Sequence, residues 1–193
     1  VPKRFLIIEQ ICVRLLLKEN GQENLKKRYK FIYLISPNKI NYNFYKDLKR
    51  IFQTKKIKYF QLRLKQFSPK KIIKIANKIK KICKSYKVKF IINDNPLIAR
   101  KVGADGCHLG QTDISINEAR KIIKNKIIGV TCHNSLNKAK AAIANKADYI
   151  AIGAFNKSVT KKTKYKATIK DLKKFRTITN KPIIAIGGIN QYN

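Results

Sequence analysis

The sequence predicts an α/β protein, a (β/α)₈ barrel that ends before its eighth strand. Apolar runs and helical segments alternate from residue 31 onward, in units of about 20 to 30 residues. The runs are continuously apolar, which is typical of parallel strands covered by helices. Seven such short units favour a barrel over an open doubly wound sheet. The barrel domain is therefore expected over residues 31–193, incomplete at its C-terminal end.

The first half of the chain supplies two strands and two helices. Residues 1–30 are expected to form a helical lead, because charged residues interrupt its apolar stretch. The strand 31–35 is closed by a Ser-Pro-Asn turn, and residues 42–52 have helical periodicity. The second strand, 57–64, precedes a long helix, 68–85, that begins with an N-cap serine and a first-turn proline.

The second half repeats the unit. The strand 90–92 ends in Asn-Asp-Asn-Pro, whose proline suits the first turn of a short helix. The strand 105–109 leads to a Ser-x-x-Glu capping box that begins the helix 115–124. The remaining expected elements are the strand 127–130, the helix 135–144, the strand 147–152, a helix from Thr168 and the strand 182–186.

The net charge of +35 first suggests binding to nucleic acid or to an anionic membrane surface. Only eight of the 45 basic residues are Arg, and the lysines are spread over every predicted helix. We therefore expect no specific nucleic-acid partner, although nonspecific attraction to polyanions at low salt follows from the charge. No apolar run approaches the length of a membrane span.

The four cysteines show no metal-ligand spacing with His and no C-x-x-C pair. Their wide separation on predicted core elements suits reduced, buried thiols, which indicates a cytoplasmic protein. They are Cys12, Cys83, Cys107 and Cys132.

Polar residues at the end of the second strand indicate an anion-binding site. Gln61, Arg63 and Lys65 alternate along the strand, so their side chains share the face toward the barrel interior. Two cations directed into a core are costly unless they meet an anion. A structural ion pair is one interpretation, and Asp94 could supply its carboxylate. Because the chain has only ten acidic residues, an anionic ligand is favoured.

Asp94 and Asp113 follow neighbouring strands, at the end where sites are built in parallel α/β folds. Two carboxylates beside Arg and Lys suit Mg²⁺, which binds a few carboxylates together with substrate phosphate oxygens. Asp113 could also act simply as a negative charge before the helix that begins at Ser115. The two roles are compatible.

Two later segments could bind phosphate. The loop after the sixth strand contains Ser158, Val159, Thr160 and Lys161, whose hydroxyls, backbone N–H groups and ammonium could bind phosphate. A solvated lysine-rich loop without a ligand is the alternative interpretation. Gly187 and Gly188 follow the seventh strand, where this fold often binds phosphate. His108 and His133 are expected to be hydrogen-bonded structural residues.

Eight short segments follow one another between residues 33 and 189: YLIS, QLRLK, IIND, ADGCHLGQTD, IIGVTCH, ADYIAIGAF, SVTK and IAIGGI. Each is weak alone, but the ordered set resembles the thiamine-phosphate synthase and thiazole tautomerase superfamily. As a thiamine-phosphate synthase, a transferase of thiamine biosynthesis, the chain would join hydroxymethylpyrimidine diphosphate to thiazole phosphate and release pyrophosphate.

The resemblance also implies residue roles. The pyrimidine diphosphate would be bound by Gln61, Arg63, Lys65 and Asn93. Mg²⁺ would be held by Asp94 and Asp113. Thr131, where the family usually has Ser, would lie beside the pyrimidine and its leaving group. The thiazole phosphate would be bound by Ser158, Val159, Thr160 and Gly187 or Gly188. The departing pyrophosphate would be stabilised by Arg63, Lys65 and Lys161.

The chain departs from the family pattern in two places. Asn156 and Lys157 stand where the family usually has Phe-Pro, and Ser158 replaces a Thr. The missing eighth strand is expected to leave the chain either inactive or a fragment of an active parent. Two other functions stay open: a thiazole tautomerase-like isomerase and an inactive, truncated basic binding protein. The expected partners are small-molecule substrates, without a membrane, and the sequence leaves homo-oligomer formation open.

Overall fold

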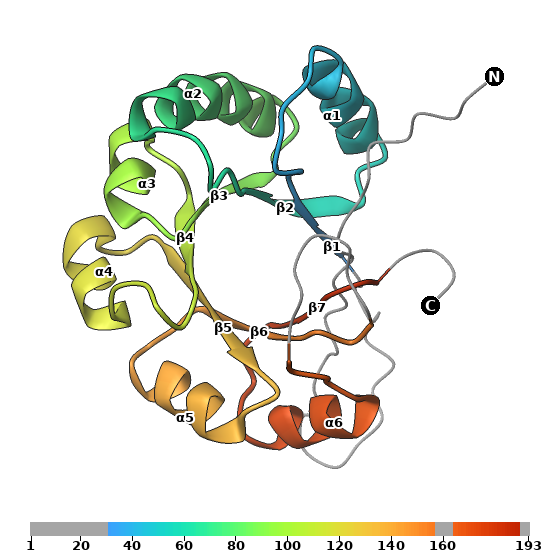
Figure 1. The fold of residues 1–193 in the computed structure, drawn as a ribbon, viewed down its shortest axis with the longest axis vertical. Coiled ribbons are helices and arrows are strands. Elements are labelled where there is room, and N and C mark those ends of the chain that lie inside the picture. Colours follow the sequence, from blue (N-terminus) through green and yellow to red (C-terminus); the bar gives the residue numbers. More distant parts are fainter. Residues whose placement is uncertain (1–30, 157–163, 190–193) are drawn as a thin grey trace.

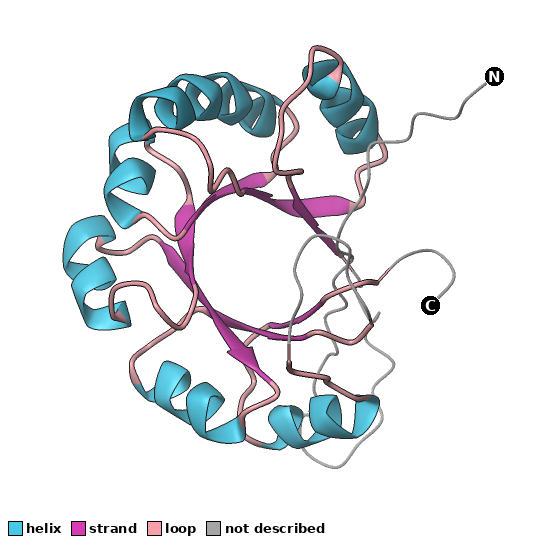
Figure 2. Cartoon of the chain, viewed as in Figure 1, coloured by secondary structure: helices cyan, strands magenta, loops and turns pink. Residues whose placement is uncertain are grey.

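The computed structural model describes residues 31–156 and 164–189. Within them, parallel strands form the inner wall of a nearly closed barrel and helices cover its outside (Figures 1 and 2). The strands are β1 (Ile32–Ile35), β2 (Ile57–Leu62), β3 (Lys89–Asn93), β4 (Gly106–Leu109), β5 (Ile127–His133), β6 (Tyr149–Gly153) and β7 (Ile183–Ile186). The helices are α1 (Phe44–Gln53), α2 (Pro69–Ser85), α3 (Pro96–Val102), α4 (Ile116–Ile123), α5 (Leu136–Ala144) and α6 (Ile169–Thr177).

The sheet has the order β1-β2-β3-β4-β5-β6-β7, and every neighbouring pair is parallel. This order confirms the predicted barrel architecture, because each strand pairs with the next one along the chain. The carboxyl ends of the strands therefore meet at one rim. The predicted helical lead, residues 1–30, lies outside the described residues.

The predicted strands and helices of the described region are all present. The largest difference is β5, which was expected to end at Val130 but continues to His133. Thr131 and His133 pair with Ala151 and Ile152 of β6 across an irregularity in the register. The prediction ended the strand where its residues became polar, whereas the backbone pairing continues past that point.

Helix starts follow the local signals in the sequence. The Ser68 side chain accepts a hydrogen bond from the Lys71 backbone N–H at the start of α2, which has its proline in the first turn. Ser115 and Glu118 form a reciprocal capping box on α4. These caps satisfy backbone N–H groups that have no partner within the helix.

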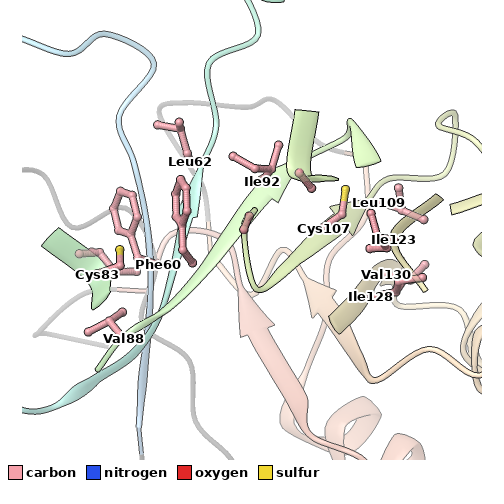
Figure 3. Packing of buried hydrophobic residues seen from close by; sticks show 14 of the residues in the cluster. Phe60, Leu62, Cys83, Val88, Ile92, Cys107, Leu109, Ile123, Ile128 and Val130 are labelled. Atoms are coloured by element: carbon pink, nitrogen blue, oxygen red, sulfur yellow. The ribbon is translucent and has the colours of Figure 1, made fainter. Parts of the chain in front are cut away.

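The core has two layers because each strand is buried on both faces. The outer layer packs between strands and helices; Figure 3 shows Phe60 and Leu62 of β2, with Cys107 and Leu109 of β4, among its members. The inner layer fills the barrel and includes Tyr33, Ile35, Tyr149, Ala151 and Ile184. This double burial explains why the strands are continuous apolar runs in the sequence.

Three of the four cysteines lie in the described region, and all three are buried and free: Cys83, Cys107 and Cys132. Burial raises the pKa of each thiol, that of Cys132 to about 12. These thiols are therefore protonated and unreactive at neutral pH, as expected of core cysteines. In the described part of the chain, no helix is long and apolar enough to cross a membrane.

Candidate active site

A cavity of about 230 Å³ opens at the carboxyl-terminal rim of the barrel. Its lining brings together side chains that are distant in sequence but that follow neighbouring strands. Those predicted from the sequence are Gln61, Arg63, Lys65, Asn93, Asp94, Asp113, Thr131 and Gly187. The structure brings these residues together in one cavity, and among the described candidates Gly188 is not part of the lining.

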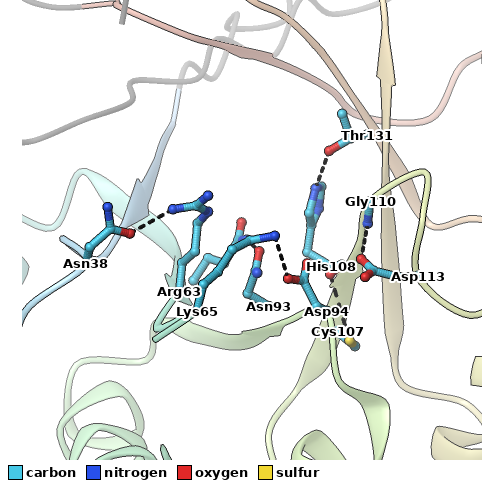
Figure 4. A network of polar contacts seen from close by, with 11 residues as sticks. Asn38, Arg63, Lys65, Asn93, Asp94, Cys107, His108, Gly110, Asp113 and Thr131 are labelled. Atoms are coloured by element: carbon cyan, nitrogen blue, oxygen red, sulfur yellow. Dashed lines mark hydrogen bonds and ion pairs between the residues drawn. The ribbon is translucent and has the colours of Figure 1, made fainter. Parts of the chain in front are cut away.

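The cations of the site extend from the end of β2, as Figure 4 shows. The Arg63 side chain donates from Nη1 to Oδ1 of Asn38 at 2.8 Å, and its backbone N–H donates to Oγ of Ser36 at 2.8 Å. Lys65 forms an ion pair with Asp94, with 3.0 Å between Nζ and Oδ2. The structural ion pair is thus realised for Lys65. Among the described residues Arg63 has no carboxylate partner, so its charge is not neutralised by a neighbouring acid.

The Asp94 backbone has a left-handed conformation, with φ of 64°. This conformation is uncommon outside glycine but is tolerated by Asp. The Asp94 backbone N–H donates to the carbonyl oxygen of His108 at 2.7 Å, which ties the end of β3 to β4. The tight turn directs the Asp94 carboxylate toward the cavity and toward Asp113 (Figure 4).

Asp113 lies across the rim from Lys65. Its Oδ2 accepts a hydrogen bond from the Gly110 backbone N–H at 2.6 Å. A Cβ atom at position 110 would lie 3.1 Å from that carboxylate oxygen, so glycine gives the carboxylate room. Burial raises the pKa of Asp113, and the neighbouring Asp94 carboxylate raises it further, against the opposing effects of the Gly110 N–H and Lys65.

The paired carboxylates fit a magnesium ion. Because the Asp94 carboxylate disfavours ionisation of Asp113, a divalent cation bound by both would offset the repulsion of their charges. Within the described residues there is no group of three or more His, Cys, Asp or Glu that could hold a metal alone. A pair of carboxylates is what Mg²⁺ uses when water and substrate phosphate complete its coordination.

His108 lies below the charged rim and is only 7% exposed. Its Nε2 is 2.8 Å from Oγ1 of Thr131, and its Nδ1 is 2.9 Å from the hydroxyl of Tyr149. Burial lowers the pKa of His108 to about 4, so the ring is neutral at pH 7. The expectation of a hydrogen-bonded histidine is met, and the ring also lines the cavity. His133 lines the cavity too and stacks on Tyr165, with 4.1 Å between ring centroids.

The sequence prediction missed several side chains of the site. Tyr33 and Tyr149 line the cavity from inside the barrel, and Asn38 holds Arg63 from the turn after β1. A signal for Tyr149 exists in Gly129, because any Cβ atom at position 129 would collide with the Tyr149 ring. The glycine in β5 therefore makes the space that the tyrosine occupies.

The predicted phosphate-binding segments are only partly described. Ser158, Val159, Thr160 and Lys161 lie outside the described residues. Gly187 lines the cavity and has φ of 95°, and a Cβ atom there would collide with Ala154. Position 187 therefore requires glycine for two independent reasons.

Comparison with known proteins decides the family. A family model described as thiamine monophosphate synthase matches residues 32–193. The chain belongs to the thiamine monophosphate synthase family. It is 58% identical over 165 residues to a thiamine-phosphate synthase of Pelagibacter ubique (strain HTCC1062), a match that covers 85% of this chain and 80% of the relative.

Other members of the thiamine monophosphate synthase family agree. A thiamine-phosphate synthase of Fusobacterium nucleatum is 42% identical over 165 residues, covering 84% of this chain and 79% of the relative. A solved structure, thiamine phosphate pyrophosphorylase from Pyrococcus furiosus, matches with a TM-score of 0.69 and 27% identity, over 76% of this chain and 69% of that chain. The expected fold, family and activity class, a transferase, are confirmed.

Proposed function

We propose that this member of the thiamine monophosphate synthase family joins hydroxymethylpyrimidine diphosphate to thiazole phosphate in the rim cavity, with release of pyrophosphate. The observation that carries the site assignment is the meeting of Arg63, Lys65, Asp94 and Asp113 in one cavity. These side chains come from three separate segments of the chain. Their chemistry, two cations beside two carboxylates, suits a magnesium diphosphate better than a neutral ligand.

Arg63 and Lys65 bind the diphosphate in this proposal. The Arg63 guanidinium is held in place by the neutral amide of Asn38, which orients it without cancelling its charge. A guanidinium fixed in this way can donate two parallel hydrogen bonds to a phosphate. Lys65 is paired with Asp94, and in this proposal the diphosphate provides the ammonium with a further anionic partner.

Asp94 and Asp113 would hold Mg²⁺. The bound ion supplies Lewis-acid stabilisation of the charge that develops on the leaving pyrophosphate. The raised pKa of Asp113 is consistent with a carboxylate whose ordinary neighbour in the working enzyme is a cation.

The amides of Gln61 and Asn93 and the hydroxyl of Thr131 hold the pyrimidine. In the reaction the bond between the pyrimidine methylene carbon and the diphosphate oxygen breaks, and its electron pair leaves with the pyrophosphate. The resulting cation is captured by the lone pair of the thiazole nitrogen, which forms the new C–N bond. Arg63, Lys65 and Lys161 stabilise the departing anion, and no general base is required at the nitrogen.

The thiazole phosphate binds Gly187 or Gly188, together with Ser158, Val159 and Thr160, which lie outside the described residues. The position of Gly187 in the cavity lining supports this placement. We further propose a cytoplasmic location, which the three buried free thiols support because they suit a reducing compartment. The partners in this proposal are the two small-molecule substrates.

A pyrophosphate-release assay tests the proposal. Release should require both substrates and Mg²⁺, and Arg63→Ala should lower turnover by orders of magnitude while the protein stays folded. Arg50→Ala, an exposed arginine in the last turn of α1, is the matched control and should leave turnover unchanged. If Arg63→Ala instead unfolds much of the protein while the folded fraction keeps normal activity, Arg63 is a structural residue.

The same preparation separates the other two functions. A tautomerase-like isomerase would convert the thiazole substrate without any pyrimidine diphosphate. A basic binding protein would bind RNA with strong salt dependence and show no turnover with either substrate.

A further inference from the structure

Beneath the charged rim, one continuous chain of hydrogen bonds crosses the interior of the barrel. Its members come from six different strands, one from each of β5, β4, β6, β1, β2 and β3. In order they are Thr131, His108, Tyr149, Tyr33, Gln61 and Asn93. All six line the cavity.

The first four links of this chain have ordinary hydrogen-bond distances. Oγ1 of Thr131 is 2.8 Å from Nε2 of His108, and Nδ1 of His108 is 2.9 Å from the Tyr149 hydroxyl. The two tyrosine hydroxyls are 2.7 Å apart, and the Tyr33 hydroxyl donates to Oε1 of Gln61 at 2.9 Å. Nε2 of Gln61 then donates to Oδ1 of Asn93.

Counting protons gives the chain a direction. Each tyrosine hydroxyl has one hydrogen, and that of Tyr33 goes to Gln61. The hydrogen between the two tyrosines must therefore belong to Tyr149. The Tyr149 oxygen then accepts from Nδ1 of His108, and the unprotonated Nε2 of this neutral ring accepts from the Thr131 hydroxyl.

We infer that His108, as the Nδ1–H tautomer, sets the direction of this chain, so that His108, Tyr149 and Tyr33 are positioning residues for the amides of Gln61 and Asn93. The opposite direction would require the proton on Nε2 of His108 and both amides turned over. The six side chains thus act as one unit, because reversing any member requires reversing the others.

The direction decides what the site offers a ligand. The oxygens of both amides are occupied as acceptors within the chain, so the amide N–H groups are what Gln61 and Asn93 present to a ring. The Thr131 hydroxyl donates its hydrogen to His108, so it presents only oxygen lone pairs to a ligand. This step rests on the proposed function. The ring nitrogens of a pyrimidine are acceptors, so they can accept hydrogen bonds from the amide N–H groups of Gln61 and Asn93.

The tautomer can be observed directly by NMR. The chain has only two histidines, so ¹⁵N-histidine labelling of the whole protein gives two ring spin systems, and a His133→Gln variant assigns them. At pH 7 His108 should be neutral with the proton on Nδ1. A proton on Nε2, or a cationic ring, would overturn the inference, and this result does not depend on whether the protein is active.

Binding tests the positioning role. Tyr149→Phe removes the hydroxyl that links His108 to Tyr33, and it should weaken binding of pyrimidine diphosphate about tenfold, the worth of one well-placed hydrogen bond. Inorganic pyrophosphate, which engages only the charged rim, should bind the variant as tightly as wild type. Tyr86→Phe, a partly buried tyrosine at the end of α2, is the matched control and should change neither affinity.

Variants at His108 add a rescue test. Asn can place a donor near the Nδ1 position, whereas Gln places its polar group near Nε2, so His108→Asn should bind pyrimidine diphosphate more tightly than His108→Gln. Equal losses for both ligands in every variant would mean that the chain is merely structural. If wild type binds pyrophosphate and not pyrimidine diphosphate, the proposed function fails, while the NMR result still shows whether the hydrogen bonds run in the inferred direction.

Discussion

Replacing His108 by Asn should remove a large, specific part of the protein's acid sensitivity. The histidine is buried and neutral between Thr131 and Tyr149. Its pKa is lowered from the ordinary 6.5 to about 4, mainly by burial. At 1.36 kcal/mol for each pKa unit, that difference corresponds to a stability change on the order of 3 kcal/mol.

The sign follows from proton binding. Between pH 6.5 and 4 the unfolded chain binds a proton at His108 and the folded protein does not, so acidification favours unfolding. The full contribution of His108 is present above pH 6.5 and is lost as the pH falls toward 4. The raised pKa of Asp113 acts in the opposite direction, but it is common to wild type and variant.

Urea unfolding at pH values from 4 to 8 measures this effect. The wild-type free energy of unfolding should fall through the window from pH 6.5 to 4, and the curve for His108→Asn should be flatter by about 3 kcal/mol over that window. His133→Asn, at the chain's other histidine, is the control and should keep the His108-dependent slope. Parallel curves for wild type and His108→Asn would refute the burial argument.

Three further predictions concern stability. Gly129→Ala should destabilise the protein by about 1–3 kcal/mol in urea unfolding, because the new methyl group collides with the Tyr149 ring; unchanged stability would mean that the ring moves freely. Ser68→Ala should cost on the order of 1 kcal/mol through loss of the α2 cap, and a neutral result would contradict the capping role. Asp113→Asn should raise the melting temperature without Mg²⁺, by removing a carboxylate that burial and Asp94 disfavour, and should abolish the rise that Mg²⁺ gives wild type. Equal Mg²⁺ stabilisation of both proteins would exclude Asp113 as a ligand.

The sequence predicted the fold well because parallel strands leave a strong pattern, a short apolar run followed by a polar turn and a capped helix. The same pattern placed Arg63, Asp94 and Asp113 at the rim, since each lies shortly after the end of a strand. Their positions in the sequence were enough to predict that they lie together, because the barrel brings the carboxyl ends of all its strands to one edge.

The interior of the site was not predictable in the same way. Tyr33 and Tyr149 lie within apolar strands, where tyrosine is also an ordinary core residue, and their hydroxyls meet although 116 positions separate them. His108 was expected to be hydrogen-bonded, but its partners depend on which strands are neighbours across the barrel. Such contacts follow from tertiary packing rather than from any local pattern.

Pyrophosphate release by the wild-type chain and by Asp94→Asn tests most directly whether the rim carboxylates serve catalysis. We predict that release by wild type requires Mg²⁺ and both substrates, and that the folded variant loses it by orders of magnitude. Equal Mg²⁺-dependent release by the two proteins would contradict this prediction.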